Sequence, residues 1–196
     1  DASEIRAAAA GHRVLVAFNR RFLSSTRAAL AGLAEQDGPR FIHVQDQGDR
    51  QEARSLGHPA TVVQNWMYAN SIHVIDYLRL FGRGDMVSVT PVVGWDPDES
   101  PYVVAKVEFD SGDIGLYQGI WDGPGPWAVS VNTPAMRWEM RPLERAAYQA
   151  RGERQLHPVE MHPWDRQFKP GFRLQAQMAV AAALDEPSES PTLAQA

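Results

Sequence analysis

Cysteine is absent from all 196 residues, so this segment holds no disulfide, thiolate metal site or cysteine nucleophile. Long apolar runs are missing too: none approaches the ~20 residues that cross a bilayer, and the N-terminus lacks the charged-then-apolar pattern of a secretory signal. Basic residues gather no further than the pair Arg20-Arg21, and the net charge is -5, which leaves no footprint for nucleic acid. We expect a soluble, cytoplasmic protein without nucleic-acid or membrane partners.

An initiator methionine is missing as well, and no G-x-G-x-x-G occurs anywhere. The opening residues, DASEIRAAAA, predict a helix through Ala10 that is capped by Asp1 or Ser3. The apolar run from Val14 to Phe18 predicts a strand buried on both faces, as in a parallel sheet. Together they form one βα piece of a larger α/β unit, so we expect the sequence to begin inside a longer protein.

The residues that are present suit a domain of ordinary size. Hydrophobic residues make up 44% of the chain and include six Trp, which is enough for a sizeable core. The pattern from Ser24 to Glu35 predicts a helix capped by Ser24 or Ser25, with Leu30 and Leu33 in the core and a Gly-Pro stop after it.

Short β-rich or alternating segments follow one another through the middle of the chain. The turns Asp110–Asp113 and Asp122–Pro126 join two pairs of them. Strands are expected at Phe41–Gln45, Val87–Val93, Val103–Phe109, Ile114–Trp121, Trp127–Asn132 and Met136–Met140. Short connections imply an antiparallel meander, and helices before and after it imply an α+β fold: an open, mainly antiparallel sheet with helices packed on one face.

Four other stretches complete the outline. Residues 46–60 are polar and glycine-containing, which favours an exposed or substrate-covering loop. Residues 150–170 lack a clear period and hold three prolines, so we expect an irregular loop there. A last helix is expected from Gly171 to Leu184, and residues 185–196 predict a loose tail.

The segment Asn65–Phe81 is the most informative one. Its apolar residues keep helical spacing, and a glycine follows it. At 3.6 residues per turn Asn70, His73 and Tyr77 share one face, with Asp76 at its border.

Three segments in order resemble the glucose-fructose oxidoreductase/inositol dehydrogenase (Gfo/Idh/MocA) family. RVLVAFNRRF at Arg13–Phe22 is similar to the end of that family's nucleotide-binding domain. NSIHVIDYLRLFG at Asn70–Gly82 is similar to the helix that carries a His followed three residues later by Asp, and an FDSG turn follows it. KPGFRLQAQMAVAAAL at Lys169–Leu184 looks like the family's late helix, so the resemblance covers almost the whole chain.

The resemblance implies that this chain is the substrate-side part of a larger NAD(P)-dependent enzyme. Residues 1–21 would be the remnant of the nucleotide-binding domain, residues 22–184 the α+β domain for substrate binding and oligomerisation, and residues 185–196 the tail. The family's glycine-rich turn and Glu-Lys-Pro motif would precede Asp1, so the main NAD or NADP site is expected outside this chain. A homodimer or homotetramer through the sheet is implied as well.

His73 is the candidate catalytic base, because hydride transfer from a carbinol carbon needs a group that takes the hydroxyl proton. The alternative is a half-buried helix residue bonded to Asp76 or Asn70. Asp76 orients His73 or satisfies a backbone donor, and Asn70 binds a substrate hydroxyl or caps the polar face. The family commonly has Asp four residues before the His, where this chain has Ala69.

Further substrate-binding candidates are Tyr77, Trp66, Arg20 and Arg21. Trp66, Trp121, Trp127 and Trp138 could each stack on a sugar face, although aromatic residues in alternating strands are more often core or interface anchors. Trp66, just before the candidate helix, is the best sugar-facing candidate. Arg20 and Arg21 lie where two domains would meet and contact substrate or cofactor, or else form surface ion pairs.

The leading hypothesis is an oxidoreductase acting on a sugar, cyclitol or related polyol. One rival is a non-catalytic dimerisation or binding module derived from the same family. A second rival is a metal-dependent activity through His157, Glu160 and His162, but their spacing matches no HExxH pattern, and we expect no metal site.

Overall fold

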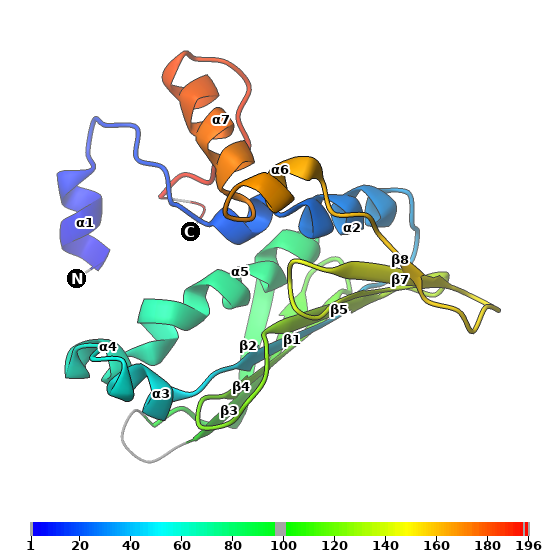
Figure 1. Cartoon of the computed structure of the whole chain (residues 1–196), viewed down its shortest axis with the longest axis horizontal. Helices are drawn as coiled ribbons and strands as arrows, with labels where there is room; N and C mark the ends of the chain where they lie inside the picture. The colour runs from blue at the N-terminus through cyan, green and yellow to red at the C-terminus, as the bar shows by residue number, and fades with distance from the viewer. Residues whose placement is uncertain (1, 97–100, 194, 196) are drawn as a thin grey trace.

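The computed structural model describes residues 2–96, 101–193 and 195. Within them, eight strands form one sheet in the order β2-β3-β4-β1-β5-β6-β7-β8, and α2, α5, α6 and α7 lie on one side of it (Figure 1). The α+β class and the helix-covered, mainly antiparallel sheet are therefore confirmed. The strands are β1 (Phe41–Gln47), β2 (Met86–Val93), β3 (Tyr102–Phe109), β4 (Ile114–Ile120), β5 (Ala128–Asn132), β6 (Met136–Met140), β7 (Ala146–Ala150) and β8 (His157–Pro158).

Apart from β1, the strands follow one another from β2 to β8, and the helices come before and after them. In order they are α1 (Ala2–Ala8), the 3-10 turn η1 (Asn19–Phe22), α2 (Ser24–Ala34), α3 (Arg50–Ser55), α4 (Ala60–Gln64), the π-helical turn η2 (Met67–Ser71), α5 (Ile72–Phe81), α6 (Pro163–Gln167) and α7 (Phe172–Ala183). None of the described helices is long and apolar enough to span a bilayer.

β1 lies in the middle of the sheet, although it precedes the meander in the sequence. It pairs in parallel with β4, where Val44 is opposite Tyr117, and antiparallel with β5, where Val44 is opposite Val129. Its side chains alternate, with Ile42, Val44 and Asp46 buried. The carboxyl ends of β1 and β4 therefore meet at the same edge of the sheet.

Close packing at two glycines seats α5 on the sheet. A Cβ on Gly82, the residue after α5, would lie 2.3 Å from the Phe109 ring, and one on Gly115 of β4 would lie 2.6 Å from Leu78. Gly82 has an ordinary φ of -72°, so its missing side chain, not its backbone freedom, is what this position requires. The predicted end of the helix at this glycine is confirmed.

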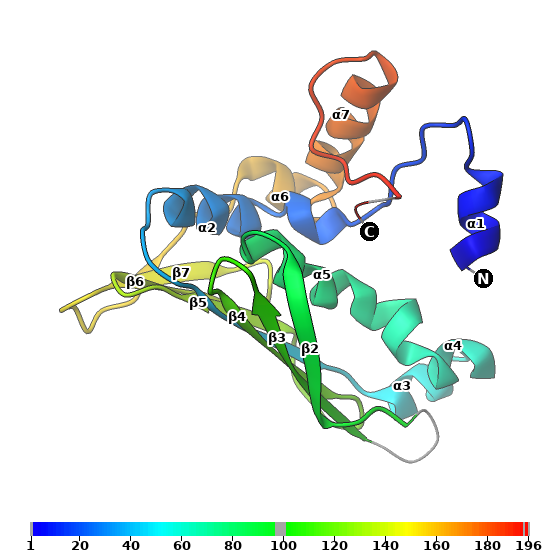
Figure 2. The same ribbon diagram turned by 180° about the vertical axis from the view of Figure 1, so that it is seen from behind.

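The predicted strand Val14–Phe18 is wrong as a regular strand. Its only bridge joins Leu15 to Thr192 near the C-terminus, and Val16 donates its N–H to the Pro191 carbonyl at 2.8 Å. A strand of a parallel sheet needs neighbours on both sides, and the described residues offer this segment only one short partner. α1 lies apart from the sheet (Figure 2), and the predicted cap Asp1 is outside the described residues.

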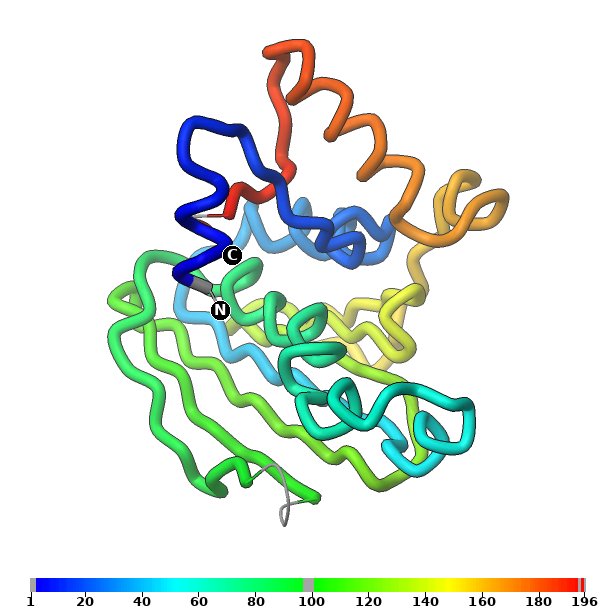
Figure 3. The backbone as a smooth tube through the Cα atoms, turned by 90° about the vertical axis from the view of Figure 1, so that its left-hand side faces the viewer, coloured from blue at the N-terminus to red at the C-terminus, as the bar shows by residue number. Residues whose placement is uncertain are grey.

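Residues beyond α7 also touch the rest of the fold. Glu189 pairs with Arg27 of α2, and the Ser188 hydroxyl donates to the Met178 carbonyl at 2.7 Å. The N- and C-terminal segments run close together on the same side of the molecule (Figure 3). The domain boundaries given above stay a prediction.

The start of α2 is capped from a distance, not by its own serines. Ser24 and Ser25 are already helical, and Leu23 precedes them without a capping side chain. The Asp165 carboxylate of α6 accepts the Ser24 N–H at 2.7 Å and the Gly171 N–H at 2.8 Å. A carboxylate at a helix N-terminus satisfies a free donor and complements the helix dipole, so the predicted local cap is replaced by a link between α2, α6 and α7.

Both predicted loops hold regular structure that the sequence interpretation missed. Within 46–60, Asp49 caps α3 by accepting the backbone N–H of Gln51 and Glu52. Within 150–170, β8 pairs with β7, and His162 caps α6, whose first residue is a proline. An Asp three residues before a Glu and a Pro at the first helical position are both start signals, so these short helices were detectable from the sequence.

The carboxylate of Asp113, in the β3–β4 turn, links three parts of the fold. It is fully buried and accepts N–H groups from Arg40 at 2.8 Å and from the Arg83 backbone at 3.0 Å. The Arg83 guanidinium donates to both of its oxygens at 2.6 and 2.9 Å. Burial opposes ionisation, but the hydrogen bonds from Arg83 and Arg40 outweigh it and lower the pKa of Asp113.

Asp113→Asn should lower the free energy of unfolding by about 3 kcal/mol near neutral pH, because it leaves Arg83 without its partner. The gap between variant and parent should close as pH falls below about 4, since a carboxyl with a lowered pKa contributes stability only while it is ionised. Urea unfolding measures both effects. Asp37→Asn, an exposed change of the same kind, is the control, and an equal loss in both variants would contradict the account.

Candidate functional site

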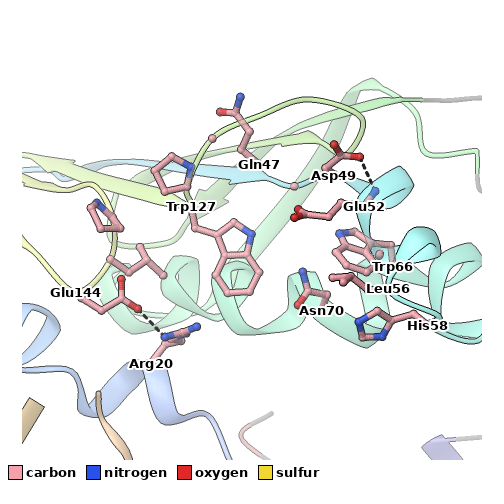
Figure 4. Close-up of a pocket in the computed structure, with 16 residues that line it drawn as sticks. Arg20, Gln47, Asp49, Glu52, Leu56, His58, Trp66, Asn70, Trp127 and Glu144 are labelled. Carbon is pink, nitrogen blue, oxygen red and sulfur yellow. Dashed lines mark hydrogen bonds and ion pairs between the residues drawn. The ribbon is translucent and has the colours of Figure 1, made fainter. Parts of the chain in front are cut away.

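A cavity of about 400 Å³ opens at the sheet edge where β1 and β4 end. The turn after β6 reaches the same edge, because β6 runs antiparallel to β5 and β5 antiparallel to β1. Helical residues from η1, α3 and the start of the α5 region complete its walls (Figure 4). Its polar and aromatic lining consists of Arg20, Gln47, Asp49, Glu52, His58, Trp66, Asn70, Trp127 and Glu144.

Two indoles give the cavity its apolar surface. Trp127 lies just before β5, and the Arg20 guanidinium is 5.6 Å from the centroid of its ring. Trp66 lies just before η2, and its buried Nε1 has no hydrogen-bond partner. In the view of Figure 4, Asn70 projects between the two indoles. Flat indole faces beside free polar groups suit the C–H faces and hydroxyls of a sugar ring.

The polar groups of the cavity divide into occupied and free ones. Arg20 pairs with Glu144 at 2.9 Å, and Asp49 accepts the Gln51 N–H at 2.8 Å. Among the described residues that line the cavity, the side chains of Glu52, His58 and Asn70 and the Trp66 Nε1–H have no hydrogen-bond partner. These groups are therefore available to a ligand.

The structure divides the predicted site residues into two sets. Arg20, Trp66 and Asn70 line the cavity, whereas Arg21, His73, Asp76 and Tyr77 do not. The π-helical turn at Met67–Ser71 is the physical reason, because its wider turn shifts the residues before it relative to those after it. A plain 3.6-residue periodicity places Asn70 with His73 and Tyr77, and the structure separates it from them.

Asp76 pairs with Arg21 and not with His73. The Arg21 guanidinium donates to both carboxylate oxygens at 2.5 and 2.6 Å, and the Asp76 side chain is only 5% exposed. This geometry therefore does not support a role for Asp76 in orienting His73. A forked pair of this kind fixes two elements in register.

Tyr77 is also occupied inside the chain. Its hydroxyl lies 2.7 Å from the Thr26 hydroxyl and donates to the Arg20 carbonyl at 3.1 Å. Burial raises its pKa. Like Asp76, Tyr77 fastens α5 to the crossing segment η1, which is a structural role.

His73 faces the same crossing segment. Its ring stands edge-on to Phe18, with the centroids 5.9 Å apart, and its Nδ1 is buried without a partner. Burial lowers the pKa of His73, the nearby Arg20 lowers it further, and Asp76 only partly opposes them. His73 is thus held as a neutral imidazole near pH 7, the form a general base requires.

The residues of the rival metal hypothesis are used elsewhere. His157 bonds to Glu153 at 2.7 Å and stacks on Tyr148, and His162 caps α6. Among residues 2–96, 101–193 and 195, no group of three or more metal-binding side chains comes together.

Six polar or aromatic lining residues were missed as site residues: Gln47, Asp49, Glu52, His58, Trp127 and Glu144. For Trp127 the sequence leaves sugar stacking and a core or interface role open, and Trp66 is the preferred candidate for stacking. Glu144 had no sequence signal, since it lies in a turn and its partner is 124 positions away. The polar composition of residues 46–60 did indicate a substrate-covering segment, and four of the six lie in it.

The parent chain should lose stability in mild acid because His73 is buried, and His73→Gln should not show this loss. Because the folded-state pKa is lowered, the unfolded chain binds more protons, and stability falls as pH drops below about 6.5. Urea unfolding from about pH 8 to about pH 5 should therefore show a flatter profile for the variant. His12→Gln replaces an exposed imidazole and should follow the parent, and identical profiles for all three would contradict the burial of His73.

No protein-family model matches the sequence, and no curated protein sequence matches it. Solved structures do match. Levoglucosan dehydrogenase in complex with NADH aligns with a TM-score of 0.75 and 16% identity, over 99% of this chain and 64% of that one. UDP-N-acetylglucosamine 3-dehydrogenase GnnA from Acidithiobacillus ferrooxidans aligns with a TM-score of 0.70 and 15% identity, over 96% and 59%.

Aldose-aldose oxidoreductase from Caulobacter crescentus, complexed with glycerol, aligns with a TM-score of 0.71 and 17% identity, over 96% of this chain and 60% of that one. This chain thus spans about three fifths of the length of the structures it matches. It has the fold of the matching part of these sugar dehydrogenases and oxidoreductases, which is the Gfo/Idh/MocA fold that the sequence resemblance implied.

Proposed function

We propose that this chain is the substrate-side domain of an NAD(P)-dependent oxidoreductase that acts on a sugar, cyclitol or related polyol. The observation that carries the proposal is the cavity at the sheet edge, with two indoles and free hydrogen-bonding groups beside the crossing segment. The structural neighbours include a levoglucosan dehydrogenase with NADH and levoglucosan, which supports a polyol substrate and a nicotinamide cofactor for the whole enzyme.

Each group of the site has a separate role in this proposal. Trp66 and Trp127 pack against the apolar face of the ring, and Asn70 and Glu52 bind its hydroxyls. His73 does not line the cavity, so to take the proton of the reacting hydroxyl as the hydride leaves it must meet a substrate that extends from the cavity toward the crossing segment. Its Nδ1 is a buried atom without a partner, which leaves Nε2 as the nitrogen that accepts the proton.

The cofactor would be held by a nucleotide-binding domain, since this chain has no glycine-rich turn. When bound, the nicotinamide supplies the acceptor for the hydride. What this chain contributes is substrate orientation, a neutral base and exclusion of water on one side of the substrate.

One observation favours the non-catalytic module. β2 is an edge strand whose apolar side chains are exposed, with Val87, Val89 and Val92 each at least 60% exposed. A row of apolar residues on an edge strand is a common pairing surface. Together with Ala69 at the family's usual Asp position, it keeps dimerisation without catalysis as the second candidate.

Joining the nucleotide-binding domain of levoglucosan dehydrogenase to the N-terminus tests the proposal. The fusion should reduce NAD+ when a polyol is added, followed by NADH absorbance, and His73→Ala should lower kcat at least ~100-fold because the proton acceptor is lost. His157→Ala, which removes a histidine of β8, is the control. A folded fusion that dimerises in sedimentation but shows no turnover would favour the non-catalytic module.

A further inference from the structure

The charges around the cavity are unequal. Three carboxylates line it, from Asp49, Glu52 and Glu144, against the guanidinium of Arg20 and the imidazole of His58. Asp49 faces the backbone N–H groups at the start of α3, which compensates it in part. Glu52 has no cation beside it among the described residues, and in Figure 4 its carboxylate points into the space in front of Trp127.

Arg20 is not free to receive an anion. It pairs with Glu144 at 2.9 Å, both side chains being about one quarter exposed, and it also lies over the Trp127 ring. A substrate carboxylate or phosphate that recruited Arg20 would leave Glu144 uncompensated beside it. Lys does not appear in the lining at all.

We infer that the cavity selects uncharged polyols and rejects anionic sugars such as uronic acids, sugar phosphates and nucleotide-linked sugars. The inference rests on the proposed function, because it concerns the same site. Asp49 and Glu52 are exposed and Glu144 is about one quarter exposed, so they repel an anion moderately and salt screens the repulsion. A sugar hydroxyl, in contrast, donates to the free carboxylate of Glu52, so the group that repels an anion also binds a neutral ring.

Glucose and glucuronate differ at a single carbon, which makes them a matched pair of probes. We expect titrations of the purified chain, followed by tryptophan fluorescence at constant ionic strength and about pH 8, to show at least ~10-fold weaker binding of glucuronate. Glu52→Gln, which removes the charge and keeps the shape, should bring the two affinities within about threefold. Glu144→Gln, which frees Arg20, should strengthen glucuronate binding. Glu35→Gln removes an exposed carboxylate outside the cavity and should leave the ratio unchanged.

The outcomes separate this inference from the proposed function. Equal binding of glucose and glucuronate by the parent chain, or an unchanged ratio in Glu52→Gln, would overturn the charge selection while leaving a polyol site in place. No fluorescence response to glucose, myo-inositol or levoglucosan would overturn the polyol site itself, and the inference with it.

Discussion

The forked ion pair between Arg21 and Asp76 is the contact on which the site depends. It fastens the crossing segment η1 to α5 with two hydrogen bonds of 2.5 and 2.6 Å in a mostly buried place. Tyr77 adds a third bond by donating to the Arg20 carbonyl. Because η1 is a single tight turn, the Arg21 side chain held by Asp76 and the Arg20 side chain point to different sides. Arg20 therefore meets Glu144 and Trp127. The same packing brings Phe18 against His73.

This arrangement explains why a neutral His73 and a paired Arg20 occur together. Arg20 lies near enough to His73 to lower its pKa, and its own charge is balanced by Glu144 on the far side. The segment that would connect to a nucleotide-binding domain therefore touches both the candidate base and the cavity. A shift of that segment would change the environment of both, since packed elements move as units.

Sequence patterns predicted the elements whose cause is local. Val103–Phe109 follows the two-residue period of a strand, and Ile72–Phe81 follows the 3.6-residue period of a helix. Both elements are present in the structure. The prediction of a strand at Val14–Phe18 was wrong because a strand needs neighbouring strands to pair with, and an apolar run in the sequence does not show whether they are present. The π turn at Met67–Ser71 was not predicted from the sequence, because one wider turn moves Asn70 away from His73 without changing the hydrophobic pattern.

The cavity itself was the least predictable part, because its walls come from turns that are distant in sequence. Arg20 was placed at a domain junction, but its partner Glu144 is 124 residues away, and only the paired strands bring their turns to one edge. Trp66 and Asn70 were predicted, since they belong to one helical segment. Trp127 had the right chemistry but carried no signal to distinguish a wall of the cavity from a core residue.

The end of β1 shows how the fold builds the acidic side of this cavity. Asp46 is fully buried, and its Oδ2 accepts the Tyr117 hydroxyl at 2.6 Å and the Trp121 Nε1–H at 2.8 Å. Burial raises the pKa of Tyr117, and the neighbouring carboxylate raises it further, so the phenol remains a donor. These two bonds hold the last residues of β1 against β4, and the chain then turns through Gly48 into the Asp49 cap of α3. The backbone position of Glu52 in the first turn of α3 therefore follows from buried hydrogen bonds beneath the cavity, while its side chain remains exposed at the cavity mouth.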